Sequence, residues 1–210
     1  TFLAKSGEGL KPDYCIGHSL GEYSALFAAG AFDFITGLKL VKKRGELMAN
    51  MHGGGMLAVI NLSLERITLL LKEHNLNSID FANFNSPKQI VLSGPAPDIT
   101  RANIILSEEA LKCIPLKVSG AFHSRYMQSV ANEFEQFIEP FEFKLLQTPV
   151  IANINARPYE DKSIKEYLVK QIISPVLWIN IISYLRNKGE SEFIDIGPGT
   201  ILTRLMGART

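Results

Sequence analysis

Short apolar runs alternate along most of this chain with longer stretches in which apolar residues recur every three or four positions. A short apolar run bounded by turn residues is typical of a buried strand, and the three-to-four spacing is typical of a helix facing a core. Expected strands cover 13–16, 149–153 and 192–196, and expected helices cover 22–29, 34–51, 126–139, 164–172 and 179–188. Strands alternating with helices predict a parallel sheet with helices on both faces. The first ten residues are expected to be the end of a helix running into a glycine-containing loop.

The pattern differs between Gly54 and Val118, where it predicts the order β-α-β-β-α-β. Expected strands cover 56–60, 79–84, 89–93 and 113–118, and expected helices cover 63–74 and 98–110. This order is the split pattern of a ferredoxin-like subdomain. Glycines at 53–55 and at 120 permit the sharp changes of direction that an insertion needs at its two ends. We therefore expect a core of residues 1–53 and 119–210 and a small ferredoxin-like subdomain of residues 54–118.

The junction between the first expected strand and the first expected helix carries the candidate chemistry. It reads Gly17-His18-Ser19-Leu20-Gly21, a G-x-S-x-G turn in the strand-to-helix context of a nucleophile elbow. Such a turn holds the central serine in a strained conformation at the amino end of a helix, where backbone N–H groups favour a developing oxyanion. The plainer alternative is that Ser19 only caps the helix. A base elsewhere in the chain decides between these interpretations.

Composition narrows the classes of partner and compartment. The chain has 210 residues, is 46% hydrophobic and 20% charged, and has a formal net charge of +1. Near-neutral charge argues against nucleic acid or an anionic membrane as the main partner, because both require a concentrated basic face. Cys15 and Cys113 lie in apolar runs and are interpreted as reduced core residues, which favours a cytoplasmic setting. No run reaches the length of a membrane span, and no signal peptide is visible.

Separated motifs, taken together, resemble one family. The chain is similar to the malonyl-CoA:acyl-carrier-protein transacylases and the related acyltransferase domains of polyketide synthases, including their free-standing versions. The matching segments, which follow the family's order over nearly the whole chain, are 17–25 (GHSLGEYSA), 43–48 (KRGELM), 121–124 (AFHS), 168–171 (LVKQ), 175–178 (PVLW) and 196–199 (IGPG). The resemblance implies an α/β-hydrolase-like core with an inserted ferredoxin-like subdomain.

The resemblance also implies catalytic roles. Ser19 would take the acyl group from a thioester as an ester, and His123 would act as its general base and then as the acid for the departing thiolate. The family orients this histidine through a main-chain carbonyl, here that of Gln171, so a Ser-His dyad without an aspartate is expected. Leu20 would supply one oxyanion N–H. No metal and no permanently bound cofactor are expected.

Substrate-binding roles follow from the same resemblance. Arg44 matches the arginine that grips the free carboxylate of a malonyl group, and Met48 lies four residues later on the same helix face. His18 would line the acyl pocket. Phe122 stands where the form of the motif is associated with malonyl selection, because its bulk would crowd a 2-methyl branch. Malonyl-CoA is thus the expected substrate, and the acceptor is the phosphopantetheine thiol of an acyl carrier protein, which a basic rim including Lys42, Lys43 or Lys117 would help to dock.

One departure from the family keeps other interpretations open. The family normally begins with a Gly-Gln-Gly-Ser-Gln segment whose first glutamine gives the second oxyanion donor, and the sequence contains no such segment. Loss of one oxyanion donor costs about 10²–10³ in rate in well-studied hydrolases. The alternatives are a hydrolase that releases stalled acyl chains from carrier proteins, which would have no use for Arg44, and a non-catalytic fragment or scaffold.

Overall fold

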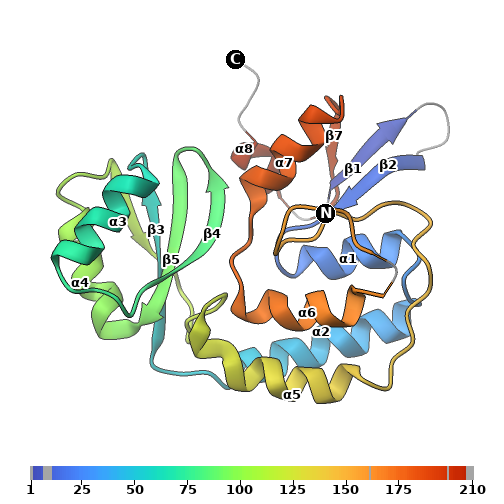
Figure 1. The fold of residues 1–210 in the computed structure, drawn as a ribbon, viewed down its shortest axis with the longest axis horizontal. Coiled ribbons are helices and arrows are strands. Elements are labelled where there is room, and N and C mark those ends of the chain that lie inside the picture. Colours follow the sequence, from blue (N-terminus) through green and yellow to red (C-terminus); the bar gives the residue numbers. More distant parts are fainter. Residues whose placement is uncertain (1, 7–10, 161, 198, 207–210) are drawn as a thin grey trace.

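The computed structural model describes residues 2–6, 11–160, 162–197 and 199–206, and places them in two bodies that lie side by side (Figure 1). The elements are β1 Phe2–Ser6, β2 Lys11–Ile16, α1 Gly21–Ala28, α2 Phe34–Ala49, β3 Gly54–Ile60, α3 Leu64–Glu73, β4 Asp80–Ser86, β5 Gln89–Pro95, α4 Ala96–Leu106, β6 Lys112–Pro115, the 3-10 helix η1 Arg125–Met127, α5 Gln128–Ile138, α6 Ile164–Ile173, α7 Trp178–Asn187, β7 Phe193–Asp195 and α8 Ile201–Leu205. The body containing β3 to β6 is inserted between α2 and η1.

The larger body is a helical layer packed beside a small sheet. Strands β2, β1 and β7 form a sheet in that order, with β1 antiparallel to both neighbours, and Cys15 of β2 makes a parallel bridge to Val150. Helices α1, α2, α5 and α6 bury one apolar cluster, which includes Tyr23, Leu40 and Phe134. A second cluster around Trp178 packs α7 against β2. These clusters fix α1 and α2 beside the end of β2.

The smaller body has the topology expected of a ferredoxin-like subdomain. Its four strands lie in the order β4-β5-β3-β6 and are antiparallel throughout, with Leu57 opposite Leu92 at the centre. Helix α3 begins where the Ser63 hydroxyl accepts a hydrogen bond from the Arg66 N–H, which is an N-cap. Helices α3 and α4 bury an apolar cluster against one face of this sheet. The α/β fold class with an inserted ferredoxin-like subdomain is thus confirmed. The parallel sheet expected in the core is wrong for the described residues, because β1 pairs antiparallel with both β2 and β7, and the expected strand 149–153 forms only isolated bridges at Val150 and Ile151.

Some boundaries differ from the expectations. Residues 2–6 form strand β1 instead of the end of a helix, because they pair between β2 and β7, a long-range pairing that local propensity does not reveal. Residues 7–10 lie outside the described residues, as does Pro198 of the matching segment 196–199. Helix α4 ends at Leu106 instead of 110, and β6 ends at Pro115 instead of 118. The residues after β6 form the connection back to the larger body.

Two connections join the bodies, and they approach each other closely. A Cβ on Gly54 would lie 2.1 Å from the Ala121 N, so only glycine fits where the outgoing and returning connections cross.

No helix in the described part of the chain is both long and apolar enough to span a membrane.

Candidate active site

Ser19 lies at the tight turn between β2 and α1, with a positive φ of 51° that a non-glycine residue adopts only under constraint. The turn closes because the backbone of Gly21 approaches Gly17: a Cβ on Gly17 would lie 2.0 Å from the Gly21 carbonyl oxygen. The backbone N–H groups of Gly21 and Glu22 donate to the carbonyls of His18 and Ser19 and start the helix. This geometry presents the Ser19 hydroxyl beyond the end of the strand.

His123 meets Ser19 across more than one hundred residues of sequence. The Ser19 Oγ and His123 Nε2 atoms lie 2.7 Å apart. His123 Nδ1 lies 2.9 Å from the main-chain oxygen of Gln171 and 3.2 Å from that of Ser174. Carbonyl oxygens only accept hydrogen bonds, so Nδ1 carries the proton and Nε2 is free to accept the serine proton. Main-chain oxygens therefore orient the His123 ring beside Ser19, and the Gln171 oxygen is the one that the family resemblance implied.

The surroundings of His123 keep its imidazole neutral. Burial lowers the pKa of His123 to about 3, and the positive charge of Arg44 acts in the same direction while hydrogen bonds to Gln171 and Ser174 oppose the shift. The side chain is only 5% exposed. Near neutral pH the ring is thus an unprotonated base, which is the form needed to accept a proton from Ser19.

Arg44 extends from α2 to Ser19. Its Nη2 donates to the Ser19 Oγ at 3.0 Å and to the Gln171 Oε1 at 3.2 Å, and its guanidinium lies 5.7 Å from the centre of the Tyr23 ring. The side chain is buried, and its Nε has no hydrogen-bond partner among the described residues. Within the same residues no carboxylate lies within ion-pair distance of Arg44. An arginine with spare donors beside the nucleophile can bind an anionic group of a substrate.

The carboxylate of Glu22 is fully buried and accepts hydrogen bonds from groups around the Ser19 turn. Its Oε1 accepts hydrogen bonds from the Asn153 N–H and the Tyr159 hydroxyl, both at 2.8 Å, and its Oε2 accepts one from the Gln171 side-chain amide. The same amide donates to the Ser19 carbonyl at 3.0 Å. Burial raises the pKa of Glu22 to about 7, against the opposing effect of these hydrogen bonds.

The Asn153 side chain makes two hydrogen bonds to the backbone of the turn at 17–21. Its side-chain oxygen accepts from the Ser19 N–H at 2.7 Å, and its side-chain nitrogen donates to the Gly17 carbonyl at 2.7 Å. The Ser19 N–H is thereby occupied. Within the described residues the Leu20 N–H makes no hydrogen bond, and Leu20 is 49% exposed, so this N–H is available to a developing oxyanion.

The other residues predicted for the site, His18, Phe122 and Met48, differ in how they contact the residues around Ser19 and His123. The His18 Nε2 lies 2.8 Å from the Asn85 Oδ1 of β4, its ring packs edge-on against Trp178, and burial lowers the pKa of His18. Phe122 adjoins His123 and packs against the apolar clusters of both bodies. Met48 lies one turn after Arg44 in the core cluster, and no hydrogen bond or ring contact within the described chain joins it to the dyad.

Some residues of the site were missed by sequence reasoning. Glu22 and Asn153 were assigned only to a helix and a strand, and Asn85 was not singled out. Each of the first two had a weak signal: Glu22 is the one charged residue in the apolar stretch 22–29, and Asn153 ends the apolar run 149–152. Their roles depend on partners distant in sequence. Across the described residues no group of three or more His, Cys, Asp or Glu side chains is arranged to hold a metal ion.

Comparisons with known proteins agree on one family. The sequence model of the acyl transferase domain matches residues 3–208. The polyketide biosynthesis malonyl CoA-acyl carrier protein transacylase BaeC of Bacillus velezensis is 52% identical over 94% of this chain and 69% of its own length. A malonyl-transacylase solved in complex with a type II polyketide synthase acyl-carrier protein superposes with a TM-score of 0.88 at 35% identity, over 94% of this chain and 66% of its own.

The chain corresponds to only part of these relatives. The polyketide biosynthesis protein PksE of Bacillus subtilis is also 52% identical, over 94% of this chain, yet the match covers 26% of its length. The other two relatives are covered to about two thirds.

Proposed function

Because this chain belongs to the acyl transferase domain family, we propose that it moves a malonyl group from malonyl-CoA to the phosphopantetheine thiol of an acyl carrier protein. Coenzyme A thioester and carrier protein are then its partners, and malonyl-CoA is a substrate. The observation that supports this most strongly is the 2.7 Å approach of the His123 Nε2 to the Ser19 Oγ, with a buried arginine hydrogen-bonded to the same oxygen.

The first half-reaction forms an ester on Ser19. The Ser19 oxygen attacks the thioester carbonyl while its proton passes to the His123 Nε2. The Leu20 N–H stabilises the oxyanion, the carbon–sulfur bond breaks, and His123 returns the proton to the coenzyme A thiolate. The neutral state that burial imposes on His123, through its lowered pKa, suits it to the first of these proton transfers.

The second half-reaction reverses these steps with a different thiol. His123 takes the proton of the phosphopantetheine thiol, whose sulfur attacks the ester carbonyl. The ester bond breaks and Ser19 recovers its proton from His123, so the dyad ends in its starting state. Both halves need the Nδ1 proton held in place, which the main-chain oxygens of Gln171 and Ser174 support.

Arg44 is proposed to select the acyl group. Its unpartnered Nε and its Nη2 lie beside the nucleophile, where the free carboxylate of a malonyl group would be bound. A hydrolase acting on stalled, uncharged acyl chains would leave this buried charge without a partner. Phe122, next to His123, is proposed to favour malonyl over a 2-methyl branched group by its bulk. His18 and Met48 are proposed to line the acyl site with it.

We also propose a cytoplasmic setting for the protein and a docking surface for the carrier protein. Cys15 and Cys113 are free thiols, which favours the reducing cytoplasm. Lys42 and Lys43, on α2, are proposed to lie on the rim that an acidic carrier protein contacts.

Mass measurement of the intact protein after mixing with malonyl-CoA tests the function. We expect one malonyl adduct on the wild type, no adduct on Ser19→Ala, and transfer of the adduct to an added carrier protein. Arg44→Ala should lose malonylation by roughly a hundredfold while gaining acetylation from acetyl-CoA, because a bidentate charge-assisted contact is removed.

Other outcomes identify the alternatives. Release of free acid without transfer would indicate the hydrolase, and an unlabelled wild type would indicate a scaffold or a polypeptide that needs further chain. Unchanged selectivity in Arg44→Ala would remove this arginine from the acyl site. Lys39→Ala, an exposed change on the same helix, is the matched control and should leave the selectivity unaltered.

A further inference from the structure

Strand β4 of the small subdomain contacts the segments that carry the catalytic dyad, and each contact involves a different part of the strand. The contacts are at Asp80, at Ala82 and Phe84, and at Asn85. The helices of the small subdomain pack on its own apolar cluster, and Met56, Ala58 and Val91 of its sheet pack with Phe122. Strand β4 makes hydrogen bonds to three separate segments of the site.

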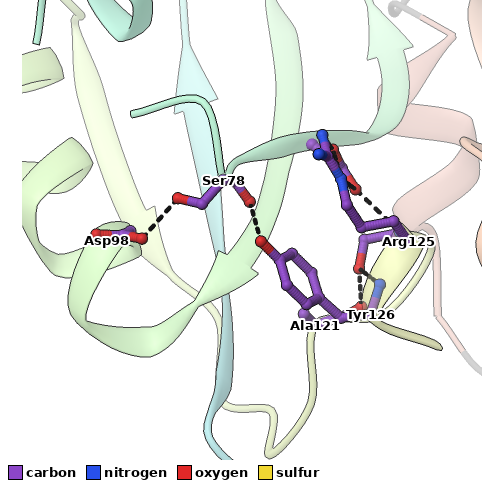
Figure 2. Close-up of polar contacts among 7 residues, drawn as sticks. Ser78, Asp98, Ala121, Arg125 and Tyr126 are labelled. Carbon is purple, nitrogen blue, oxygen red and sulfur yellow. Dashed lines mark hydrogen bonds and ion pairs between the residues drawn. The ribbon is translucent and has the colours of Figure 1, made fainter. Parts of the chain in front are cut away.

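The first contact fixes the segment that bears His123. The Asp80 carboxylate accepts hydrogen bonds from the Arg125 backbone N–H at 2.9 Å and from its Nε at 2.9 Å, and also pairs with its Nη2. Figure 2 shows the Arg125 side chain reaching up to the strand and the Tyr126 ring extending toward Ser78, whose carbonyl accepts from the Tyr126 hydroxyl at 2.8 Å. Asp80 thus accepts the first backbone N–H of the short helix η1, which begins two residues after His123 and has Ser124 as its N-cap.

The histidine itself has a backbone that needs such support. His123 has a positive φ of 58°, a conformation that costs a non-glycine residue free energy and persists only where its surroundings enforce it. On one side of it, Phe122 packs between the clusters of the two bodies. On the other side, the Ser124 hydroxyl donates to the Ala121 carbonyl and closes the turn. The hydrogen bonds between Asp80 and Arg125 lie directly after this turn.

The second contact lies close to one of the two acceptors of the His123 Nδ1 proton. Val176 forms a parallel bridge with Asn83: its N–H donates to the Ala82 carbonyl, and its carbonyl accepts from the Phe84 N–H, each at 2.9 Å. Ser174, two residues earlier, provides one of the carbonyl oxygens that hold His123. The same strand therefore contacts the segment that bears the histidine and the segment that carries one of the oxygens orienting its ring.

The third contact reaches the residue before the nucleophile. The Asn85 Oδ1 lies 2.8 Å from the His18 Nε2, and the Asn85 amide is itself held by Gln89 at 2.9 Å. Along its length, β4 thus contacts the neighbours of both members of the dyad.

We infer that Asp80 is a positioning residue for His123, and that β4 sets the geometry of the dyad in the acyl transfer proposed above, on which this inference rests. Displacement of a reacting group by a fraction of an ångström lowers the rate far more than it lowers stability. The Arg125 side chain is 61% exposed, so solvent screens its ion pair with the largely buried Asp80 (18% exposed), and the pair contributes only modestly to stability. Asp80 acts on the reaction only through the segment 121–126.

Asp80→Ala, compared with Glu109→Ala, tests this inference. Glu109 pairs with Arg66 inside the small subdomain, away from the site, so it controls for the loss of an ion pair; its side chain is 37% exposed, against 18% for Asp80. We expect Asp80→Ala to lower the rate of malonylation at saturating malonyl-CoA by about tenfold or more, with the half-saturating concentration changed less than about twofold. Glu109→Ala should retain the wild-type rate. The two variants should have similar thermal midpoints.

A second readout does not depend on activity. The ring ¹⁵N chemical shifts of His123, assigned by their loss in His123→Gln, report which nitrogen carries the proton. The wild type should show two well-separated values, because Nδ1–H is held by carbonyl oxygens. In Asp80→Ala the two values should converge as the ring samples both tautomers, and in Glu109→Ala they should stay apart.

These readouts separate the possible failures. An active wild type whose rate and ¹⁵N values are unchanged in Asp80→Ala would overturn the inference alone. A wild type that forms no adduct would overturn the proposed function, and the ¹⁵N values would still decide the role of Asp80. If Asp80→Ala does not fold, Asp80→Asn, which keeps the shape and one acceptor oxygen, takes its place with the same expected direction.

Discussion

At the residue scale, burial and hydrogen bonding act in opposite directions on the pKa of Glu22. Its carboxylate is fully buried, and three donors from distant parts of the chain point at it. Donors stabilise the ionised form, whereas burial favours the neutral form, and burial is the larger effect because the pKa is raised to about 7. Stability of the native state must therefore depend on pH through this residue.

The sign of that dependence follows from the direction of the shift. A group with a raised pKa binds its proton more tightly in the folded chain, so its stabilising contribution is complete below the ordinary value of 4.5 and is lost as pH rises through about 7. We expect the free energy of unfolding of the wild type, relative to Glu22→Gln, to fall by roughly 3 kcal/mol between these limits, at about 1.4 kcal/mol for each pKa unit. Urea unfolding at a series of pH values measures this difference.

Glu133→Gln is the control for this experiment, because Glu133 lies exposed on α5. Its free energy of unfolding should stay within about 0.5 kcal/mol of the wild-type value, as is usual for an exposed substitution. A constant difference for Glu22→Gln would show that Glu22 titrates normally in the folded chain.

At the scale of elements, the unit formed by β2, the turn and α1 requires a glycine at position 17. A Cβ at Gly17 would overlap the Gly21 backbone at 2.0 Å, and the atoms it would meet are all backbone, so no flexible side chain can move away. The turn brings Ser19 to His123, so the catalytic geometry and the local fold share one steric condition.

Gly17→Ala and Gly45→Ala, compared in parallel, check this condition. Gly17→Ala should lower the free energy of unfolding by about 3 kcal/mol or more and abolish malonylation. Gly45 lies in the interior of α2 next to Arg44, and a Cβ added there would meet no atom within 4 Å. Gly45→Ala should therefore stabilise the chain by up to about 1 kcal/mol through helix propensity.

The measurement is chemical denaturation of both variants together with intact mass after malonyl-CoA treatment. An active, stable Gly17→Ala protein would mean that the turn relaxes in a way the structure does not show.

At the scale of the whole molecule, the two bodies share an apolar boundary. Phe122 and Val118, from the returning connection, pack on a cluster that includes Met56 and Ala82 of the small sheet, and Phe122 also packs on the core of the larger body. Backbone hydrogen bonds between β4 and Val176 cross the same boundary. Neither body can lose its structure without exposing apolar surface of the other.

We therefore expect the described chain to unfold in one cooperative step. The single tryptophan, Trp178, is fully buried in the larger body, so its fluorescence reports that body, whereas far-UV circular dichroism reports both. Urea transitions followed by the two probes should superimpose. Two separated midpoints, with the fluorescence change at one of them, would show that the bodies unfold independently.

The sequence by itself determined the features that depend on neighbours along the chain. Alternation of apolar runs identified the strand before Gly17, the helix after it and the order of elements in the insertion, because side-chain period reflects which face is buried. The arrangement of Gly17 to Gly21 predicted the elbow, because only small residues permit that turn. Boundaries such as the ends of α4 and β6 were less accurate, because neighbouring residues there satisfy either state.

The tertiary structure decided how distant groups meet. The family resemblance implied that Ser19 and His123 form a pair, but their 2.7 Å distance, the buried Glu22 carboxylate beneath the turn, and the ion pair between Asp80 and Arg125 were visible only in the structure; each joins residues more than 40 positions apart. The strand formed by residues 2–6 likewise arises from pairing with β7, near the other end of the described chain. Such partners leave no periodic pattern in the sequence, because they are fixed by the packing of whole elements and not by the conformational preference of any one segment.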